Sequence, residues 1–429
     1  MKKPALQLFL LLSLAALPSS FAALPSSAEH FPDRTGKLAA MRQSVWAEWC
    51  DALGRSLPVS PLAMKPLSEG AITSWEIPDS LEPHATLDFR SGTKGIEPEA
   101  GWPCYLYLHG SGPRDMEWQT GWQLAQAFDD APAFYCIPKI PNEGKLYRWW
   151  QRGKLWAWGN LLRWTLAQPN VDASRLYVFG ISEGAYGSQR LASYYADYFA
   201  AAGPMAGGEP LKNAPVENLG HTAFHFHTGD QDAMFYRNLL TQGTAEALDS
   251  IERLYPGEYH HSISLIPGRG HHIDYFPTTP WLSRHRRTPQ PHHFLWENLE
   301  MDSVKRNCFY NLEVLAETDA YRTAYEFSTD GRNHIDISVK RVEYATTFVD
   351  RMWNIDLFFA RHYADAEHGR LRVFLSEELI DLNRPVSITI NGRTIYEGRA
   401  KISRETMRHA AKLWGDPLRL FPAAVEVEW

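Results

Sequence analysis

The 429-residue sequence contains only four cysteines, no long basic run, no internal repeat and no low-complexity tract. The densest basic cluster, at residues 284–287, is too short for a nucleic-acid-binding surface, and the formal net charge is −7. A repeat array and a nucleic-acid partner are therefore excluded. The hydrophobic content of 44% and the charged content of 22% are those of an ordinary globular protein, with two or three domains for this length.

The scarcity and the positions of cysteine argue against a disulfide scaffold. Cys104 and Cys136 lie in apolar runs typical of buried neighbouring strands, where a free cysteine behaves as a small hydrophobe. Cys50 and Cys308 flank the central region and could pair only if the two ends of the chain pack together. A chain of this length can bury a core without cross-links.

The first residues have the features of a signal peptide. A positive start at residues 1–3 precedes an apolar stretch at residues 8–17 that is too short to span a bilayer. Residues 20–22 fit a cleavage site, with residues 26–28 as the alternative. We expect residues 1–22 to be removed and the protein to be secreted or periplasmic, with no membrane span.

Residues 175–184 are the most informative part of the chain. An apolar strand runs into a Gly-x-Ser-x-Gly turn centred on Ser182, and residues 185–199 follow with a helical pattern. A serine at the tip of such a turn has an exposed hydroxyl, and the glycines let strand and helix approach closely. Ser182 is thus the predicted nucleophile. The Glu183 backbone N–H, at the helix N-terminus, is a predicted oxyanion donor.

A second oxyanion donor is expected from an upstream loop. The apolar strand at residues 104–108 ends in His109-Gly110-Ser111-Gly112. A glycine-containing loop at this point can turn the N–H of Gly110 or Ser111 toward the oxyanion position.

The acid and the base are expected downstream, each after a strand. Residues 223–227 lead to Asp230 and Asp232, and residues 262–266 lead to His271 and His272. The carboxyl ends of strands in open α/β sheets form one ligand-binding edge, so serine, acid and histidine can converge there. The pattern predicts a Ser-His-Asp triad but leaves both doublets open.

These motifs in this order resemble the α/β-hydrolase superfamily over about residues 70–300. The similarity is to secreted carboxylesterases of the polyhydroxybutyrate-depolymerase and feruloyl-esterase kind, and the elbow also resembles prolyl-oligopeptidase-type serine peptidases. The resemblance implies an α/β fold, a mostly parallel sheet with helices on both faces. It also implies that the acid is Asp232, three residues after the turn glycine, and that the base is His271, directly after Gly270.

Such a triad needs no metal or cofactor. A neutral imidazole activates the serine, the aspartate fixes its tautomer, and an acyl-enzyme forms. His225 and His227 share one face of a strand and could ligate zinc, but no third ligand follows at a recognisable spacing. We therefore expect no metal site.

Large rings are dense after residue 146. Trp156, Trp158 and Trp164 fall in a helical pattern and are expected to pack on the sheet. Arg148, Trp149 and Trp150 follow a strand end on the active-site side. They are predicted either as a substrate pocket, whose aromatic walls would suit an aromatic or sugar-bearing ester, or as core.

After about residue 305 the pattern changes to alternating strands, with a hairpin signal at Asn391-Gly392 and one helix at about residues 404–414. We predict a catalytic domain at residues 23–305 and a β-rich, sandwich-like domain at residues 306–429. The second domain is either a structural brace or a carbohydrate- or partner-binding module, with Trp353 or Trp429 as a stacking ring.

The expected function is an exported serine hydrolase acting on a small-molecule or polysaccharide-linked carboxylic ester. A prolyl-oligopeptidase-type peptidase is the alternative, although too few residues precede His109 for the propeller of that group. A non-catalytic binding protein on a hydrolase fold is the third possibility. The sequence does not indicate an oligomeric state.

Overall fold

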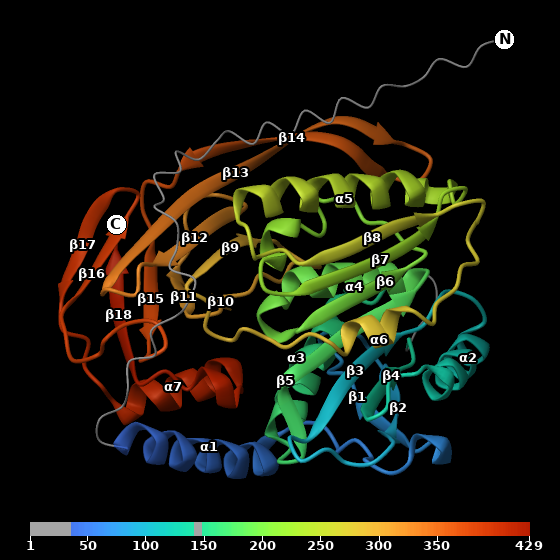
Figure 1. Cartoon of the computed structure of the whole chain (residues 1–429), viewed down its shortest axis with the longest axis horizontal. Helices are drawn as coiled ribbons and strands as arrows, with labels where there is room; N and C mark the ends of the chain where they lie inside the picture. Colours follow the sequence, from blue (N-terminus) through green and yellow to red (C-terminus); the bar gives the residue numbers. More distant parts are fainter. Residues whose placement is uncertain (1–35, 141–147) are drawn as a thin grey trace.

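The computed structural model describes residues 36–140 and 148–429, so the predicted signal peptide lies outside the described residues. One large sheet with its helices fills the middle of the chain, and two further sheets follow it (Figure 1). None of the helices in the described ranges is long and apolar enough to cross a membrane.

The large sheet has eight strands, and β2 runs opposite to its neighbours β1 and β4 while the remaining pairs are parallel. Strands β3, β4 and β7 are buried at every position, as central strands covered on both faces must be. In spatial order the strands are β1 (Ile72–Glu76), β2 (Thr86–Lys94), β4 (Ala133–Pro138), β3 (Trp102–Leu108), β5 (Val171–Ile181), β6 (Ala201–Met205), β7 (Ala223–Gly229) and β8 (His261–Ile266).

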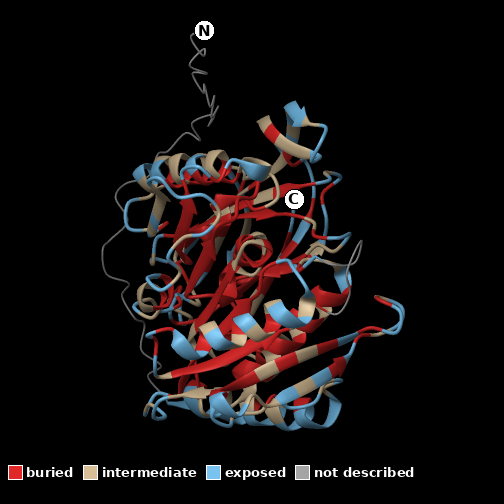
Figure 2. Cartoon of the chain, turned by 90° about the vertical axis from the view of Figure 1, so that its right-hand side faces the viewer, coloured by how far each residue is buried: buried red, intermediate tan, exposed pale blue. Residues whose placement is uncertain are grey.

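Helices cover both faces of this sheet. One face packs against α3 (Arg152–Ala167), α4 (Glu183–Tyr194) and α5 (Arg237–Leu254). The other packs against α2 (Arg114–Ala127) and α6 (Thr278–Leu282). Figure 2 shows the strands as a buried layer beneath helices whose outer sides are exposed. The predicted α/β architecture is confirmed, and we call residues 62–282 the parallel-sheet module.

Two mostly antiparallel sheets form the C-terminal module, residues 293–429. Their inner faces meet through rings such as Trp296 and Phe309, stacked with centroids 5.3 Å apart. One sheet contains β10 (Cys308–Phe309), β11 (Leu312–Ala316), β15 (Arg370–Leu375) and β18 (Ala423–Glu428). The other contains β17 (Arg393–Gly398), β16 (Val386–Ile390), β13 (His334–Asp350), β12 (Thr323–Thr329) and β9 (His293–Asn298), with β14 (Ile355–Asp365) also paired to β13.

The predicted hairpin turn and the predicted helix of this module are both confirmed. Asn391 and Gly392 both have positive φ, 46° and 76°, at the turn between β16 and β17. Helix α7 spans Arg404–Trp414 as expected, and Ser403 caps it by accepting a hydrogen bond from the Thr406 N–H. Trp429 is half-buried, and its indole N–H donates to the Ala366 carbonyl at 3.2 Å.

The predicted domain boundaries need correction at both ends. Strand β9 pairs with β12, so the C-terminal module begins at His293 rather than at residue 306. Helix α1 (Lys37–Ser56) packs on α7 and not on the large sheet, through Val45 against Met407 and Ala411 (Figure 1). Both errors have one cause, because an apolar strand or helix face indicates burial but does not identify the element that buries it.

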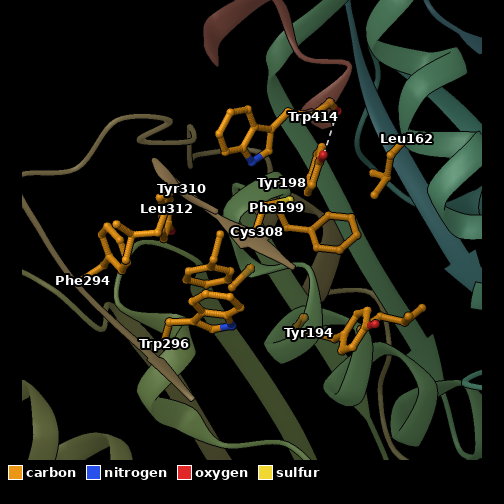
Figure 3. Packing of buried hydrophobic residues seen from close by; sticks show 14 of the residues in the cluster. Leu162, Tyr194, Tyr198, Phe199, Phe294, Trp296, Cys308, Tyr310, Leu312 and Trp414 are labelled. Atoms are coloured by element: carbon orange, nitrogen blue, oxygen red, sulfur yellow. Dashed lines mark hydrogen bonds between the residues drawn. The ribbon is translucent and has the colours of Figure 1, made fainter. Parts of the chain in front are cut away.

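A buried ion network joins the two modules. Asp197, after α4, accepts hydrogen bonds from Arg306 and Arg419, and Asp416 accepts from Arg287 and Arg419. All five side chains are at most 8% exposed. The Arg419 guanidinium lies 4.2 Å from the centroid of the Tyr198 ring. The Tyr198 hydroxyl donates to the Trp414 carbonyl at 2.7 Å, as Figure 3 shows. The modules therefore share one continuous core.

All four cysteines are free thiols. Cys104 and Cys136 are buried on neighbouring strands, as expected, and Cys308 is buried beside Arg306 at the module junction. Cys50 lies on α1 and approaches the Ala167 carbonyl, so it does not pair with Cys308. Helix α1 is held to the C-terminal module by apolar packing and by ion pairs such as Arg42–Glu377, and not by a disulfide.

His293 on β9 predicts a pH dependence of stability. Burial lowers the pKa of its imidazole, but hydrogen bonds to Glu258 and Glu326 outweigh burial and raise the pKa to about 9. This stabilisation is complete below the unfolded value of about 6.5 and is lost as pH rises through about 9. Wild-type unfolding free energy should fall by up to about 3 kcal/mol across this window.

Denaturant unfolding at pH 6 and pH 9 measures the effect, with His293→Gln as the control because glutamine keeps polarity without a charge. The variant should lose most of the difference between the two pH values. An equal slope in both proteins would contradict the assignment.

Candidate active site

Ser182 lies at the sharp turn between β5 and α4. Its backbone has φ 57° and ψ −114°, a conformation that non-glycine residues rarely adopt. Its N–H donates to the Met205 carbonyl at 2.9 Å. A Cβ on Gly184 would lie only 1.9 Å from the Leu108 carbonyl oxygen, so no side chain fits there. A Cβ on Gly180 would likewise lie 2.4 Å from the Gly184 carbonyl oxygen. Gly180 and Gly184 thus allow the strand and the helix to approach closely at Ser182.

The structure brings Ser182, His271 and Asp232 together in one hydrogen-bonded chain. His271 Nε2 lies 3.0 Å from Ser182 Oγ, and His271 Nδ1 lies 2.7 Å from Asp232 Oδ2. The Asp232 carboxylate is almost completely buried, while the His271 side chain is 34% exposed. Activation of the serine and access from solvent are both possible in this arrangement.

The other member of each doublet lies elsewhere. Asp230 is exposed, and its Oδ1 accepts the Gly268 N–H at 2.9 Å, tying together the two loops that follow β7 and β8. The His272 ring is exposed, and its centroid lies 6.1 Å from that of His271. Neither side chain joins the chain of hydrogen bonds at Ser182.

Strand order, elbow and the chain order Ser, Asp, His coincide with one known architecture. The chain has the α/β-hydrolase fold.

Comparisons with known proteins find similarity to hydrolases over part of the chain. No protein-family profile matches the chain. Poly(3-hydroxyalkanoate) depolymerase C of Paucimonas lemoignei is 30% identical over 124 residues, which are 26% of this chain and 29% of that protein. The chain therefore spans less than a third of that relative.

Solved structures with partial similarity include a thermostable esterase, with a TM-score of 0.41 and 20% identity over 52% of this chain and 64% of that one. A ferulic acid esterase has a TM-score of 0.37 and 14% identity, covering 50% and 98% of the two chains. For a poly(3-hydroxybutyrate) depolymerase from Bordetella parapertussis the values are 0.35 and 14%, covering 50% and 86%.

Arg237 contacts the predicted acid Asp232, and the sequence analysis did not predict this contact. Its guanidinium donates to Asp232 Oδ1 at 3.0 Å, and the side chain is 8% exposed. This buried, charge-assisted hydrogen bond holds the Asp232 carboxylate in a fixed orientation. Arg237 begins α5, and no sequence motif distinguishes it from other arginines near a helix start.

The two expected oxyanion donors flank the serine. A Cβ on Gly110 would lie 3.5 Å from Ser182 Cβ, so this loop runs directly beside the nucleophile. Glu183 is the first residue of α4, where backbone N–H groups have no acceptor within the helix. Ser111 is exposed and lies one residue further along the loop.

The buried His109 side chain fixes the loop at residues 109–112 through two hydrogen bonds. Its Nε2 accepts the Ile140 N–H at 3.3 Å, and its Nδ1 donates to the Gly110 carbonyl at 2.7 Å. Burial lowers the pKa of this imidazole to about 4, so it is neutral near pH 7. One tautomer therefore satisfies both hydrogen bonds and holds the glycine in place.

Of the predicted pocket residues, Trp149 belongs to the core. It is fully buried, its ring packs against Gly187 on α4, and its indole N–H donates to the His109 carbonyl at 3.3 Å. The pocket hypothesis for Trp149 is wrong. The strand-end rule located its backbone at the active-site edge, but the side chain turns inward beneath the elbow.

Arg148 and Trp150 lie nearer the surface. Arg148 forms an ion pair with the Glu183 carboxylate at 2.7 Å and is 48% exposed. Burial raises the pKa of the Glu183 carboxyl, and the Arg148 charge opposes this shift. Trp150 is half-buried, with the Arg190 guanidinium 4.0 Å from a ring centroid. These two side chains remain candidates for contact with substrate.

Two groups of possible metal ligands lie away from the hydrogen-bonded chain. His225 and His227 bond to each other through their Nε2 atoms, and His227 Nδ1 lies 2.8 Å from Ser264 Oγ. Burial lowers the pKa of both, to about 3 for His225. Among the described residues, Asp249, Glu252 and His261 place three ligand atoms within 4.8 Å of one another, at the opposite end of β8 from the His271 loop.

Proposed function

We propose that this protein is a serine hydrolase that cleaves carboxylic esters, with Ser182 as nucleophile, His271 as general base and Asp232 as the acid that orients the base. The observation that carries the proposal is the unbroken Asp232–His271–Ser182 hydrogen-bonded chain at a strained elbow. A structural serine has no need of a positive φ or of a histidine with a buried aspartate behind it.

The steps follow from this geometry. His271 Nε2 accepts the Ser182 proton as Oγ attacks the ester carbonyl, and Asp232 stabilises the imidazolium. The oxyanion meets the N–H groups of Glu183 and the Gly110–Ser111 loop. His271 then gives the proton to the departing alcohol, and water, activated by the same imidazole, releases the acid from the acyl-serine. These residues complete the cycle without a cofactor.

An ester is the favoured substrate class because the similar proteins described above include esterases and polyester depolymerases. An aryl or sugar-linked ester could be selected by stacking on an aromatic side chain. Trp150 is the candidate for this contact, because Trp149 is buried. We extend the proposal to a small-molecule or polysaccharide-linked ester encountered outside the cytoplasm, because residues 1–22 have the composition of a signal peptide.

A substrate panel tests the class. Initial rates with p-nitrophenyl acetate, methyl ferulate and an aminoacyl-proline anilide should show hydrolysis of one or both esters and none of the anilide, with Ser182→Ala inactive on all three. Cleavage of the anilide in preference to the esters would replace this proposal by the peptidase alternative. A wild-type protein inert toward all three and toward a fluorophosphonate would favour a non-catalytic binding function.

A further inference from the structure

The long β13–β14 hairpin of the C-terminal module reaches across α5 to the parallel-sheet module (Figure 1). Residues 351–354 connect its strands. At this tip the Trp353 ring packs edge-on against Phe235, with centroids 4.4 Å apart at 70°. The Tyr236 hydroxyl donates to Asp350 Oδ2 at 2.6 Å. The hairpin tip thus contacts two consecutive residues, Phe235 and Tyr236, in the segment that follows Asp232.

Those two residues are strained. Phe235 has φ 56° and Tyr236 has φ 59°, two successive non-glycine residues in the left-handed region. Such a conformation persists only where surrounding contacts impose it. Trp353 and Asp350 are contacts of this kind, and they come from a strand pair more than a hundred residues away in sequence.

The segment leads directly to the acid. Arg237 follows Tyr236, and its guanidinium lies 4.9 Å from the Phe235 ring centroid on one side and 3.0 Å from Asp232 Oδ1 at its tip. A cation over an aromatic face is attracted to it, so the Phe235 ring helps to fix the guanidinium. Trp353, Phe235, Arg237 and Asp232 form a continuous row of contacts that ends at His271.

The hairpin itself is anchored along its length. Lys212 pairs with Asp356 at 2.6 Å, and Arg361 pairs with Glu217. The Trp353 N–H donates to Asp350 Oδ1 at 2.8 Å, which fixes the turn at the tip. The tip therefore has a defined position relative to the Asp232 segment.

We propose that the tip of the β13–β14 hairpin positions the catalytic acid. By holding Phe235 and Tyr236, Trp353 and Asp350 orient Arg237, which keeps the Asp232 carboxylate aligned with His271 Nδ1. The inference rests on the proposed function, and it gives the C-terminal module a part in the active enzyme rather than the role of a brace alone.

Two substitution pairs test the proposal. Trp353→Ala and Asp350→Ala should each lower kcat by roughly 10-fold, with KM changed less than about 2-fold, because the acid loses alignment and the substrate loses no contact. The rate of labelling by a small fluorophosphonate should fall in parallel, since it reports serine activation without a substrate pocket. Trp353→Phe and Asp350→Asn should restore most of the rate, because each keeps a ring or an acceptor.

Met352→Ala is the matched control, because Met352 lies on the same tip and is 78% exposed. It should leave kcat, KM and labelling unchanged. A raised KM with unchanged kcat in Trp353→Ala would make the tip a substrate contact and overturn the positioning role. Unchanged kcat and labelling in both alanine variants, whatever their melting temperatures, would also overturn it. If Trp353→Ala does not fold, the Asp350 pair decides. A wild-type protein that no fluorophosphonate labels would instead refute the proposed function.

Discussion

Replacement of Asp232 by asparagine is expected to lower kcat by about 10,000-fold with a small change in KM. The carboxylate accepts the His271 Nδ1 hydrogen at 2.7 Å and so leaves Nε2 free to take the serine proton. An amide that donates to Nδ1 would put the imidazole hydrogen on Nε2, the wrong tautomer for a base. The buried Arg237 guanidinium would also lose its anionic partner. Steady-state kinetics on the best ester of the panel measures the effect.

Asp230→Asn is the control for this prediction, because Asp230 belongs to the same turn and is exposed. Its carboxylate accepts a backbone N–H from Gly268, which an asparagine oxygen also can accept. We expect less than about a 3-fold loss of kcat. Comparable losses in the two variants would show that the turn as a whole, and not the Asp232 carboxylate, supports activity.

Asp197→Ala should produce the largest loss of stability, about 3–5 kcal/mol in the free energy of unfolding. Burial raises the pKa of this carboxyl, but the charges of Arg306 and Arg419 outweigh burial and lower it below its usual range. Removal of the carboxylate leaves the buried Arg306 guanidinium without its anionic partner and leaves Arg419 paired with Asp416 alone. Denaturant unfolding at pH 7 measures the change.

The same network predicts an acid sensitivity. A carboxyl with a lowered folded pKa contributes stability above its unfolded pKa and loses it as pH falls toward the folded value. The wild-type protein should therefore lose this stabilisation below about pH 4, and Asp197→Ala should lack that component. Asp319→Ala removes an exposed carboxylate paired with His368 and should cost no more than about 1 kcal/mol. Equal costs in the two variants would contradict the account of the junction.

The local sequence was sufficient to predict the sharp turn at Ser182. The spacing of Gly180, Ser182 and Gly184 between a strand and a helix encodes a turn whose close contacts exclude side chains, and the structure has that turn. The choice of Asp232 over Asp230 needed a resemblance to known hydrolases. The two residues are two positions apart in one turn, and the direction of each carboxylate depends on Gly268 and His271, which lie in the loop after β8.

Non-local packing set the limits of the sequence analysis. The burial of Trp149 depends on Gly187, 38 residues later, where the absence of a side chain makes room for the indole. Trp353 was predicted only as a possible stacking ring of a binding module; it is 45% exposed and packs against Phe235. The sequences around Trp353 and Phe235 do not predict their contact, because it depends on where the long β13–β14 hairpin places its tip.

Labelling of Ser182 by a fluorophosphonate tests the central claim most directly. The reagent phosphonylates a serine only when a neighbouring base activates its hydroxyl, so it reports the state of the site without knowledge of the natural ester. We expect one covalent adduct on the wild-type protein, located by mass spectrometry on Ser182, and none on Ser182→Ala. A wild-type protein that remains unlabelled, or a Ser182→Ala variant labelled as fast as wild type, would contradict the assignment of the triad.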